Sequence, residues 1–229
     1  MLRAFRQEQS HPQQFAAALA QDVVAQLSRH GSLTGALVLD VGSGPGWYRS
    51  VVEQAGARYL GVEPDSDELS EGFGAAGGLL RGDGRHLPLR DRSVDIVVCS
   101  NVLEHVAQPE QLADELVRVV RPGGLVHLSY TLWLSPWGGH ETSPWHYLGG
   151  ARAERRYRRK RGHPPKNRYG TTLFPLSAAR MLRWARANPG VDVVEAVPRY
   201  HPAWLGWLMR VPGVRELAGW NLLLVLRKR

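Results

Sequence analysis

The sequence VLDVGSGPGWY, at residues 38–48, decides how the rest of the chain is interpreted. A short apolar run ends in the acid Asp40, and three glycines follow at alternate positions, Gly42, Gly44 and Gly46. This pattern is typical of a buried parallel strand that turns into a helix through a loop whose backbone lies close to a ligand. The stretch therefore predicts an α/β fold with a ligand at this loop.

The acid limits which ligand the loop can take. A pyrophosphate at the start of a helix is held by a positive field, which a neighbouring carboxylate would oppose. The dinucleotide fingerprint also requires a glycine at position 47, where this chain has Trp47. An acid beside a glycine turn instead favours a ligand that carries an ammonium and a sulfonium group.

Three later segments extend the pattern. In GVEPD, residues 61–65, Glu63 follows Gly42 by 21 positions, the separation at which a second-strand carboxylate binds ribose hydroxyls. Residues 81–106, RGDGRHLPLRDRSVDIVVCSNVLEHV, contain a Gly-Asp pair, a Leu-Pro turn and an apolar strand. Residues 116–130, LVRVVRPGGLVHLSY, contain the end of a helix, a Pro-Gly-Gly turn and another strand.

In this order and spacing, the four segments resemble the motifs of the class I S-adenosylmethionine-dependent methyltransferases, of the methyltransferase type 11-like kind. The resemblance covers about residues 36–130, and the sequence of residues 131–176 is similar to that of actinobacterial members. It implies a three-layer, Rossmann-like sandwich with a mostly parallel seven-stranded sheet. In that fold the last strand is antiparallel and lies between the fifth and sixth.

The resemblance also implies the cofactor, S-adenosylmethionine, and the residues around it. Asp83 matches the family position that accepts a hydrogen bond from the adenine amino group, and Gly84 leaves room for the ring. Ser100 and Asn101, after the fourth strand, line the methionine end. A turn acid at Asp83 and an ordinary strand-end charge at Glu63 are the alternatives. The expected cofactor residues are Asp40, Gly42, Ser43, Gly44, Gly46, Glu63, Asp83, Gly84, Ser100 and Asn101.

Length and composition agree with one enzyme domain. The chain has 229 residues, of which 43% are apolar, enough for one sizeable core. Its single cysteine, Cys99, excludes an internal disulfide. We predict no signal peptide, because the first twenty residues carry charges and no apolar run, and the apolar run 222–226 is too short to span a membrane. We expect a cytoplasmic protein, at most peripheral at the inner membrane surface; the oligomeric state is not indicated.

Charge is distributed unevenly along the chain. Residues 1–130 hold 11 arginines and 16 acidic residues, a net charge of −5. Residues 131–229 hold 18 basic and 5 acidic residues, a net charge of +13. The acidic part suits a cationic cofactor, so the basic excess is expected where the methyl acceptor binds.

The organisation follows from alternating strand and helix patterns. We expect strands at 37–41, 58–63, 79–81, 94–100, 125–130, 191–197 and 221–226, and helices at 12–29, 48–55, 65–75, 110–120 and 177–187. The single domain is divided into an N-terminal helical cap (1–35), a cofactor-binding core (36–130), an acceptor-binding insertion (131–176) and a C-terminal helix with strands (177–229).

The insertion supplies the candidate catalytic residues. If the acceptor is a hydroxyl, its proton must be removed, which requires a base near neutral pKa. His140 is the first candidate, with Glu141 and His146 as neighbours that orient or replace it. The alternative is that these side chains brace the aromatic loop. We expect no metal, because their spacing matches no recognised metal signature. For His105 we expect a helix-start or lid role.

The arginine run at 152–161 has three functional interpretations besides a solvated helix face. It grips a phosphate of the acceptor, it lies against an anionic membrane surface beside the tryptophans of 204–220, or it holds RNA phosphates. RNA is the weaker choice, since no nucleic-acid motif accompanies the run. We expect methyl transfer to oxygen of a small-molecule or cell-envelope glycan or lipid-linked acceptor. The alternatives are methylation of RNA, of nitrogen in another small molecule, or a regulatory module that binds the cofactor without transfer.

Overall fold

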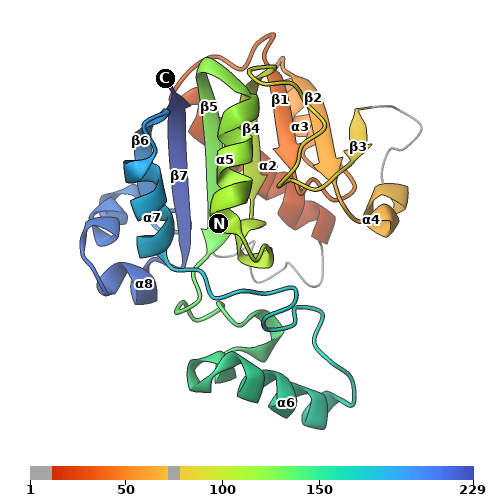
Figure 1. Cartoon of the computed structure of the whole chain (residues 1–229), viewed down its shortest axis with the longest axis vertical. Helices are drawn as coiled ribbons and strands as arrows, with labels where there is room; N and C mark the ends of the chain where they lie inside the picture. The colour runs from red at the N-terminus through yellow and green to blue at the C-terminus, as the bar shows by residue number, and fades with distance from the viewer. Residues whose placement is uncertain (1–11, 72–77) are drawn as a thin grey trace.

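The computed structural model describes residues 12–71 and 78–229, and its centre is a seven-stranded sheet (Figure 1). The strand order is β3-β2-β1-β4-β5-β7-β6. The strands are β1 (Leu37–Val41), β2 (Arg58–Glu63), β3 (Leu79–Arg81), β4 (Val94–Ser100), β5 (Val120–Thr131), β6 (Val191–Pro198) and β7 (Asn221–Lys228).

The register of the sheet confirms the expected fold. β1 pairs in parallel with β2 and β4, and β4 pairs in parallel with β5. The last strand, β7, pairs antiparallel with both β5 and β6, so it lies between the fifth and sixth strands as predicted. Because both faces of β7 are covered, its apolar residues from Leu222 to Leu226 are all buried.

One strand is longer than the sequence pattern indicated. β5 begins at Val120, which pairs with Val94, whereas Leu125 pairs with Ile96. The Pro-Gly-Gly turn therefore forms an irregularity inside the strand, not a loop before it. In contrast, the helix expected at 65–75 is described only over α4 (Ser66–Glu71), and residues 72–75 lie outside the described part of the chain.

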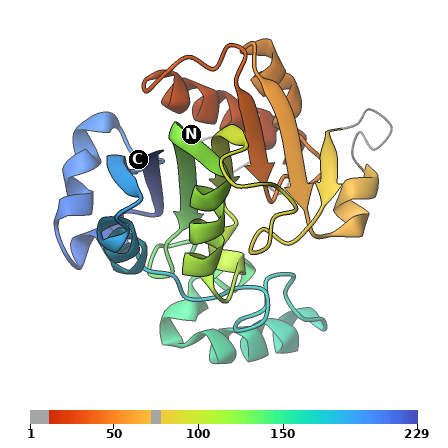
Figure 2. The ribbon, with the colours of Figure 1, turned by 45° about the horizontal axis from the view of Figure 1, so that its top comes forward.

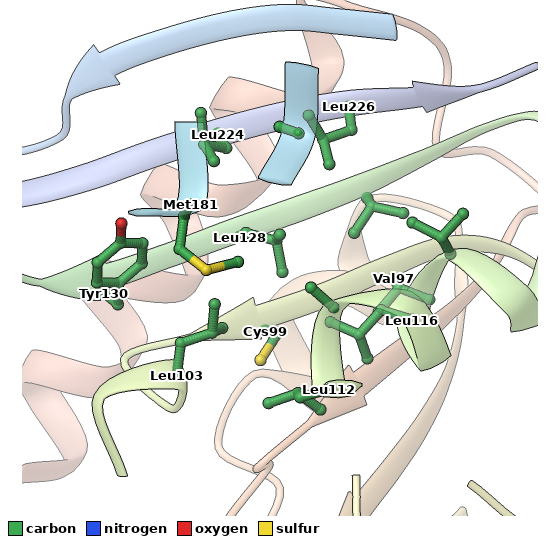
Figure 3. Packing of buried hydrophobic residues seen from close by; sticks show 14 of the residues in the cluster. Val97, Cys99, Leu103, Leu112, Leu116, Leu128, Tyr130, Met181, Leu224 and Leu226 are labelled. Atoms are coloured by element: carbon green, nitrogen blue, oxygen red, sulfur yellow. The ribbon is translucent and has the colours of Figure 1, made fainter. Parts of the chain in front are cut away.

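Helices cover both faces of the sheet (Figures 1 and 2). The core helices are α2 (Pro12–Ser28), α3 (Arg49–Gln54), α5 (Pro109–Val119) and α7 (Ala178–Ala187). α5 and α7 bury residues such as Leu112 and Met181 in one apolar cluster, which Figure 3 shows against β4, β5 and β7. α2 and α3 bury Val23, Leu27 and Val52 in a second cluster on the opposite face. The side chain of Phe15, part of the apolar spacing in α2, lies outside the described residues.

The predicted acceptor insertion extends from the end of β5 and lies apart from the main body in Figure 1. It contains three short helical elements, η2 (His140–Thr142), η3 (Trp145–Leu148) and α6 (Gly150–Arg161). The C-terminal part adds η4 (Ala203–Arg210) and α8 (Val214–Ala218) before β7. Among the described residues, no helix is long and apolar enough to cross a bilayer.

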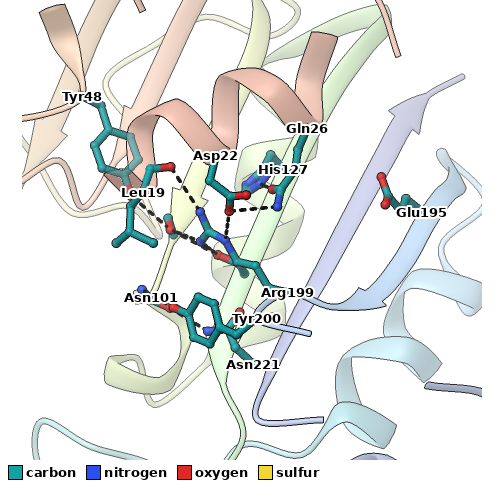
Figure 4. A network of polar contacts seen from close by, with 12 residues as sticks. Leu19, Asp22, Gln26, Tyr48, Asn101, His127, Glu195, Arg199, Tyr200 and Asn221 are labelled. Carbon is teal, nitrogen blue, oxygen red and sulfur yellow. Dashed lines mark hydrogen bonds and ion pairs between the residues drawn. The ribbon is translucent and has the colours of Figure 1, made fainter. Parts of the chain in front are cut away.

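A buried cation links the sheet to α2. The side chain of Arg199, directly after β6, is fully buried, and its Nε lies 3.0 Å from Oδ2 of Asp22 on α2. Its Nη1 donates to the hydroxyls of Ser100 on β4, at 2.7 Å, and Ser129 on β5, at 2.6 Å. Figure 4 shows the side chain of Arg199 next to Asp22 of α2. One guanidinium therefore joins three strands and a helix that are far apart in the sequence.

We predict that Asp22→Asn lowers the free energy of unfolding by about 2–3 kcal/mol, because it leaves the buried guanidinium without an acidic partner. The loss is below that for a fully buried pair, since Asp22 is 22% exposed and the serine hydroxyls remain. Urea denaturation measures the change. Asp192→Asn is the control, because the pair of Asp192 with Arg229 is exposed and its loss should cause no measurable change. Equal effects of the two variants would contradict this role of Arg199.

Candidate functional site

The loop after β1 has the backbone conformation that its glycines were expected to permit. Gly42, Gly44 and Gly46 have φ of +74°, +52° and +84°, the left-handed region that other residues rarely adopt. A Cβ at Gly42 would also overlap the side chain of Val102. The amide of Gly42 donates to the carbonyl of Val62 at 2.8 Å, which fixes the loop against the end of β2.

Asp40 lies under this loop and is only 4% exposed. Its Oδ2 accepts a hydrogen bond from the hydroxyl of Tyr59 at 2.9 Å. Burial raises the pKa of Asp40 to about 7; the Tyr59 hydrogen bond opposes the rise and the charge of Glu63 adds to it. A cation that binds near this buried carboxyl group would stabilise its charged form.

Glu63, at the end of β2, is tied to the same loop. Its Oε2 accepts from the amide of Gly44 at 2.9 Å, and its Oε1 accepts from the amide of Asp65 at 3.1 Å. Ser43 is also buried, and its amide lies 3.3 Å from the carbonyl of Val62. The structure therefore brings the predicted residues of the first two strands together at one edge of the sheet.

Asp83 and Gly84 follow β3, and each contacts other residues of the chain. Asp83 forms a forked ion pair with Arg85, with contacts of 2.6 to 3.1 Å. These hydrogen bonds hold the pKa of Asp83 below its usual value. A Cβ at Gly84 would lie 2.8 Å from both Leu112 and Val41, so core packing alone is enough to require glycine there.

Ser100 and Asn101 follow β4 and join the network around Arg199. Oγ of Ser100 accepts from Arg199 and lies 3.3 Å from the hydroxyl of Tyr48. Asn101 has a φ of +57°, and its Oδ1 accepts from Nδ2 of Asn221 at 2.8 Å. No local sequence pattern marks Arg199, because its hydrogen-bond partners are between 70 and 180 positions away.

Two of the predicted catalytic residues have bracing contacts. His146 is 1% exposed, with Nε2 3.1 Å from the carbonyl of Ser135 and its ring packed edge-on against Trp133. Glu141 accepts from Nδ2 of Asn167 at 3.1 and 3.2 Å. These contacts correspond to the bracing alternative for His146 and Glu141.

His140 lies instead beside Glu104 and His105, in the short helical turn that follows β4. One potential ligand atom from each of Glu104, His105 and His140 lies within 4.8 Å of the others, and the two rings are 5.2 Å apart. We call these three residues the histidine cluster. Burial lowers the pKa of His140 to about 4, so its ring is neutral at pH 7. The sequence motif Leu-Glu-His-Val was visible, but its closeness to position 140 was not.

A hollow of about 160 Å³ lies between α6 and the residues that follow His140 in the chain. The guanidinium of Arg156 lies 3.8 Å above the ring of Trp145 at this place. The hollow is lined by Glu141, Thr142, Ser143, Trp145, Ala153, Arg156, Tyr157, Lys160 and Arg161. Its walls thus combine aromatic faces with positive charge, and Glu141 connects it to His140 along the chain.

The chain has relatives of similar length. It is 51% identical to an uncharacterized methyltransferase of Mycobacteroides abscessus, over 100% of this chain and 93% of the relative. It is 53% identical to an uncharacterized methyltransferase of Mycobacterium leprae, over 100% of this chain and 88% of the relative. Residues 39–128 also match the family described as "Methyltransferase domain".

Solved structures share the fold at low identity. An S-adenosylmethionine-dependent methyltransferase from Mesorhizobium loti aligns with a TM-score of 0.62 and 20% identity, over 89% of this chain and 96% of that one. A putative methyltransferase of Haloferax volcanii, in complex with the Trm112 activator, aligns with a TM-score of 0.59 and 19% identity, over 98% and 93%. These two likenesses concern the fold alone.

The raised pKa of Asp40 predicts a pH dependence of stability in the unliganded protein. The folded pKa of about 7 exceeds the ordinary 3.8, so the unfolded chain releases this proton first as pH rises. Stability is therefore lost between about pH 4 and pH 7, by roughly 4 kcal/mol. Asp40→Asn should remove this slope and be more stable than the wild type at pH 8, as measured by urea denaturation.

Tyr59→Phe provides the matched variant for this test. It removes the hydrogen bond that opposes the rise in the pKa of Asp40. The upper end of the pH range over which stability is lost should therefore move to higher pH. If the difference in stability between wild type and Asp40→Asn is the same at pH 5 and pH 8, the carboxyl of Asp40 is not perturbed as described.

Proposed function

Because the chain belongs to the class I S-adenosylmethionine-dependent methyltransferases, we propose that its substrate is a small-molecule or cell-envelope glycan or lipid-linked acceptor, methylated on oxygen. The observation that carries this proposal is the position of the histidine cluster. It lies at the carboxyl ends of β4 and β5, where open α/β sheets bind ligands, and His140 is followed in the chain by Glu141, which lines the basic and aromatic hollow on α6.

We propose that the cofactor occupies the edge of the sheet beside the glycine loop. Asp40, Gly42, Ser43, Gly44, Gly46, Glu63, Asp83, Gly84, Ser100 and Asn101 form the proposed binding set. The fit rests on two buried carboxylates, Asp40 and Glu63, that flank a loop of left-handed glycines. Glu63 would accept from the ribose hydroxyls, and the exposed carboxylate of Asp83 would accept from the adenine amino group.

When bound, S-adenosylmethionine supplies a methyl group on a positively charged sulfur, which an acceptor oxygen can attack in line, leaving a neutral thioether. The leaving group needs no acid, so the protein contributes alignment and the exclusion of water. Well-oriented reactants gain roughly 7–11 kcal/mol from such alignment. The buried floor formed by Arg199, Ser100 and Ser129 keeps this edge rigid.

The acceptor hydroxyl would lose its proton at the histidine cluster. Within the described part of the chain, Nε2 of His140 is buried and has no hydrogen-bond partner. The pKa of His140, about 4, is lower than the near-neutral value expected of the base, so its ring is neutral and able to accept a hydrogen bond from the hydroxyl. We propose that deprotonation depends on His140 in this role, whereas Glu141 and His146 hold the insertion in place around it.

The acceptor class is inferred from α6 and the neighbouring hollow. α6 carries six arginines and one lysine against a single glutamate. Arginine guanidinium groups bind phosphate in forked geometry, and flat rings such as that of Trp145 offer a face to sugars. The exposed tryptophans of η4, Trp204 at 73% and Trp207 at 49%, suit contact with a lipid interface if the acceptor is lipid-linked.

We predict that Glu63→Gln weakens binding of both S-adenosylmethionine and its demethylated product by about 10- to 100-fold, because both ligands carry the ribose hydroxyls that a charged acceptor holds. Calorimetric titration of the purified chain measures both affinities. Glu53→Gln is the control, since Glu53 lies on the surface of α3 in an exposed pair with Arg49 and should leave both affinities unchanged. Equal affinities in wild type and Glu63→Gln would remove Glu63 from the site.

The acceptor is tested with methyl-tritiated cofactor. Purified protein is added to a lysate of a strain that lacks it, and the labelled products are separated into lipid, glycan, RNA and protein. We expect label in the lipid or glycan fraction, and His140→Asn should reduce its rate of appearance by about 10²- to 10⁴-fold. Asparagine is chosen because it tolerates the positive φ of +47° at this position.

Other distributions of label would contradict the proposal in defined ways. Label in RNA alone would exclude the glycan and lipid-linked acceptors. Binding of the cofactor without any labelled product would favour a regulatory module. An unchanged rate in His140→Asn would remove this side chain from the deprotonation step.

A further inference from the structure

We propose that Glu104, His105 and His140 bind one divalent transition-metal ion of the zinc or manganese class, with open positions for an oxygen of the acceptor. The idea that the acceptor meets this ion rests on the proposed function, whereas binding of the ion does not. Two imidazole nitrogens and one carboxylate oxygen are a donor set that leaves coordination positions free for a substrate.

Unused donor atoms are the first argument. Glu104 is 1% exposed, and its Oε2 is buried without a hydrogen-bond partner among the described residues. Nε2 of His140 is buried and unpartnered in the same way. An unpaired carboxylate oxygen and an imidazole lone pair inside a protein are costly, and a bound cation would satisfy both at once.

The third ligand is already oriented as metal-binding histidines usually are. Nδ1 of His105 lies 2.7 Å from the carbonyl of Thr172, so this nitrogen carries the proton and donates it. The other nitrogen, Nε2, therefore holds the lone pair. A histidine that donates one ring N–H to a backbone carbonyl presents its opposite nitrogen to a metal in a fixed direction.

The backbone also fixes the other two ligands. Oε1 of Glu104 accepts from the amide of Thr131 at 2.9 Å, which leaves Oε2 as the free oxygen. His140 has the left-handed φ of +47°, and its amide donates to the carbonyl of Trp137 at 2.8 Å. Such strained backbone is typical of functional positions.

The spacing is close to that of a metal site. One potential ligand atom from each of the three residues lies within 4.8 Å of the other two. Ligand atoms on one tetrahedral zinc are about 3.4 Å apart, given metal–ligand bonds near 2.1 Å. Small side-chain rotations are therefore enough to close the site. The nitrogen donors favour zinc, cobalt or manganese over magnesium and calcium, which prefer oxygen ligands.

An ion bound at the histidine cluster would lie where it could take part in methyl transfer. Glu104 and His105 form η1 (Leu103–His105), directly after β4, and Thr131 ends β5. A cation there would hold an acceptor hydroxyl at the carboxyl edge of the sheet and lower its pKa, releasing the proton to solvent. In that case His140 acts as a ligand in the step assigned to it above.

The test uses the untagged, full-length chain after dialysis against a chelator. Zinc is titrated by calorimetry, and cobalt is followed by its visible absorption. We expect one zinc or cobalt ion per chain and no comparable binding of magnesium. Glu104→Gln and His140→Asn should each weaken zinc binding by more than about 100-fold, because loss of a ligand exceeds the loss caused by an outer partner.

His86→Asn is the matched control, because His86 is an exposed histidine that contacts only Gln111 by a hydrogen bond among the described side chains. It should bind zinc as the wild type does. Circular dichroism and binding of the demethylated cofactor show whether each variant is folded, and His105→Asn replaces Glu104→Gln if the buried change prevents folding.

The outcomes separate the metal site from the proposed function. Zinc affinities that are equal in wild type, Glu104→Gln, His105→Asn and His140→Asn would overturn the metal site. The site would also be overturned if chelated protein neither takes up zinc nor changes its rate of methyl transfer when zinc is added. Tight zinc binding that requires the cluster, without labelling of any acceptor, would support the metal site and contradict the proposed function.

Discussion

The carboxyl edge of the sheet depends on one buried guanidinium. The side chain of Arg199 is fully buried, and its charge is balanced by Asp22, by the hydroxyls of Ser100 and Ser129 and by the carbonyl of Leu19. These contacts connect α2, β4 and β5 with the end of β6. A buried cation held by several partners is costly to displace, which keeps the strand ends in a single arrangement. The loops that follow β4 and β5 are therefore built on a rigid base.

Two groups of side chains use this base for different purposes. Around the glycine loop, Asp40 and Glu63 are the two buried carboxyl groups of the proposed cofactor site. On the other side of β4, Glu104 and the two histidines of the histidine cluster provide unpartnered donor atoms toward the insertion. The basic helix α6 lies beyond them. Acidic side chains thus gather around the glycine loop and basic side chains on α6, as the uneven distribution of charge along the sequence indicated.

The candidate site was predictable where its residues belong to local motifs. Asp40 and Glu63 were identified from their spacing, and the structure places both at the glycine loop. His146 was not separable from His140 in sequence, because both lie in one histidine-bearing loop. Only the fold shows that His146 packs against Trp133 and Ser135, whereas His140 faces the residues after β4. Which histidine joins the histidine cluster depends on contacts between distant segments, and a local sequence pattern does not reveal such contacts.

The sequence by itself determined the family, the α/β fold and most strand positions, because hydrophobic periodicity and glycine spacing act within a few residues. It also indicated the antiparallel last strand through the family resemblance, and the sheet order confirms it. The tertiary structure decided which distant side chains meet: Arg199 with Asp22, and His140 with Glu104. These pairs are set by how helices and loops pack on the sheet. That packing depends on contacts between distant segments, and no single segment specifies it.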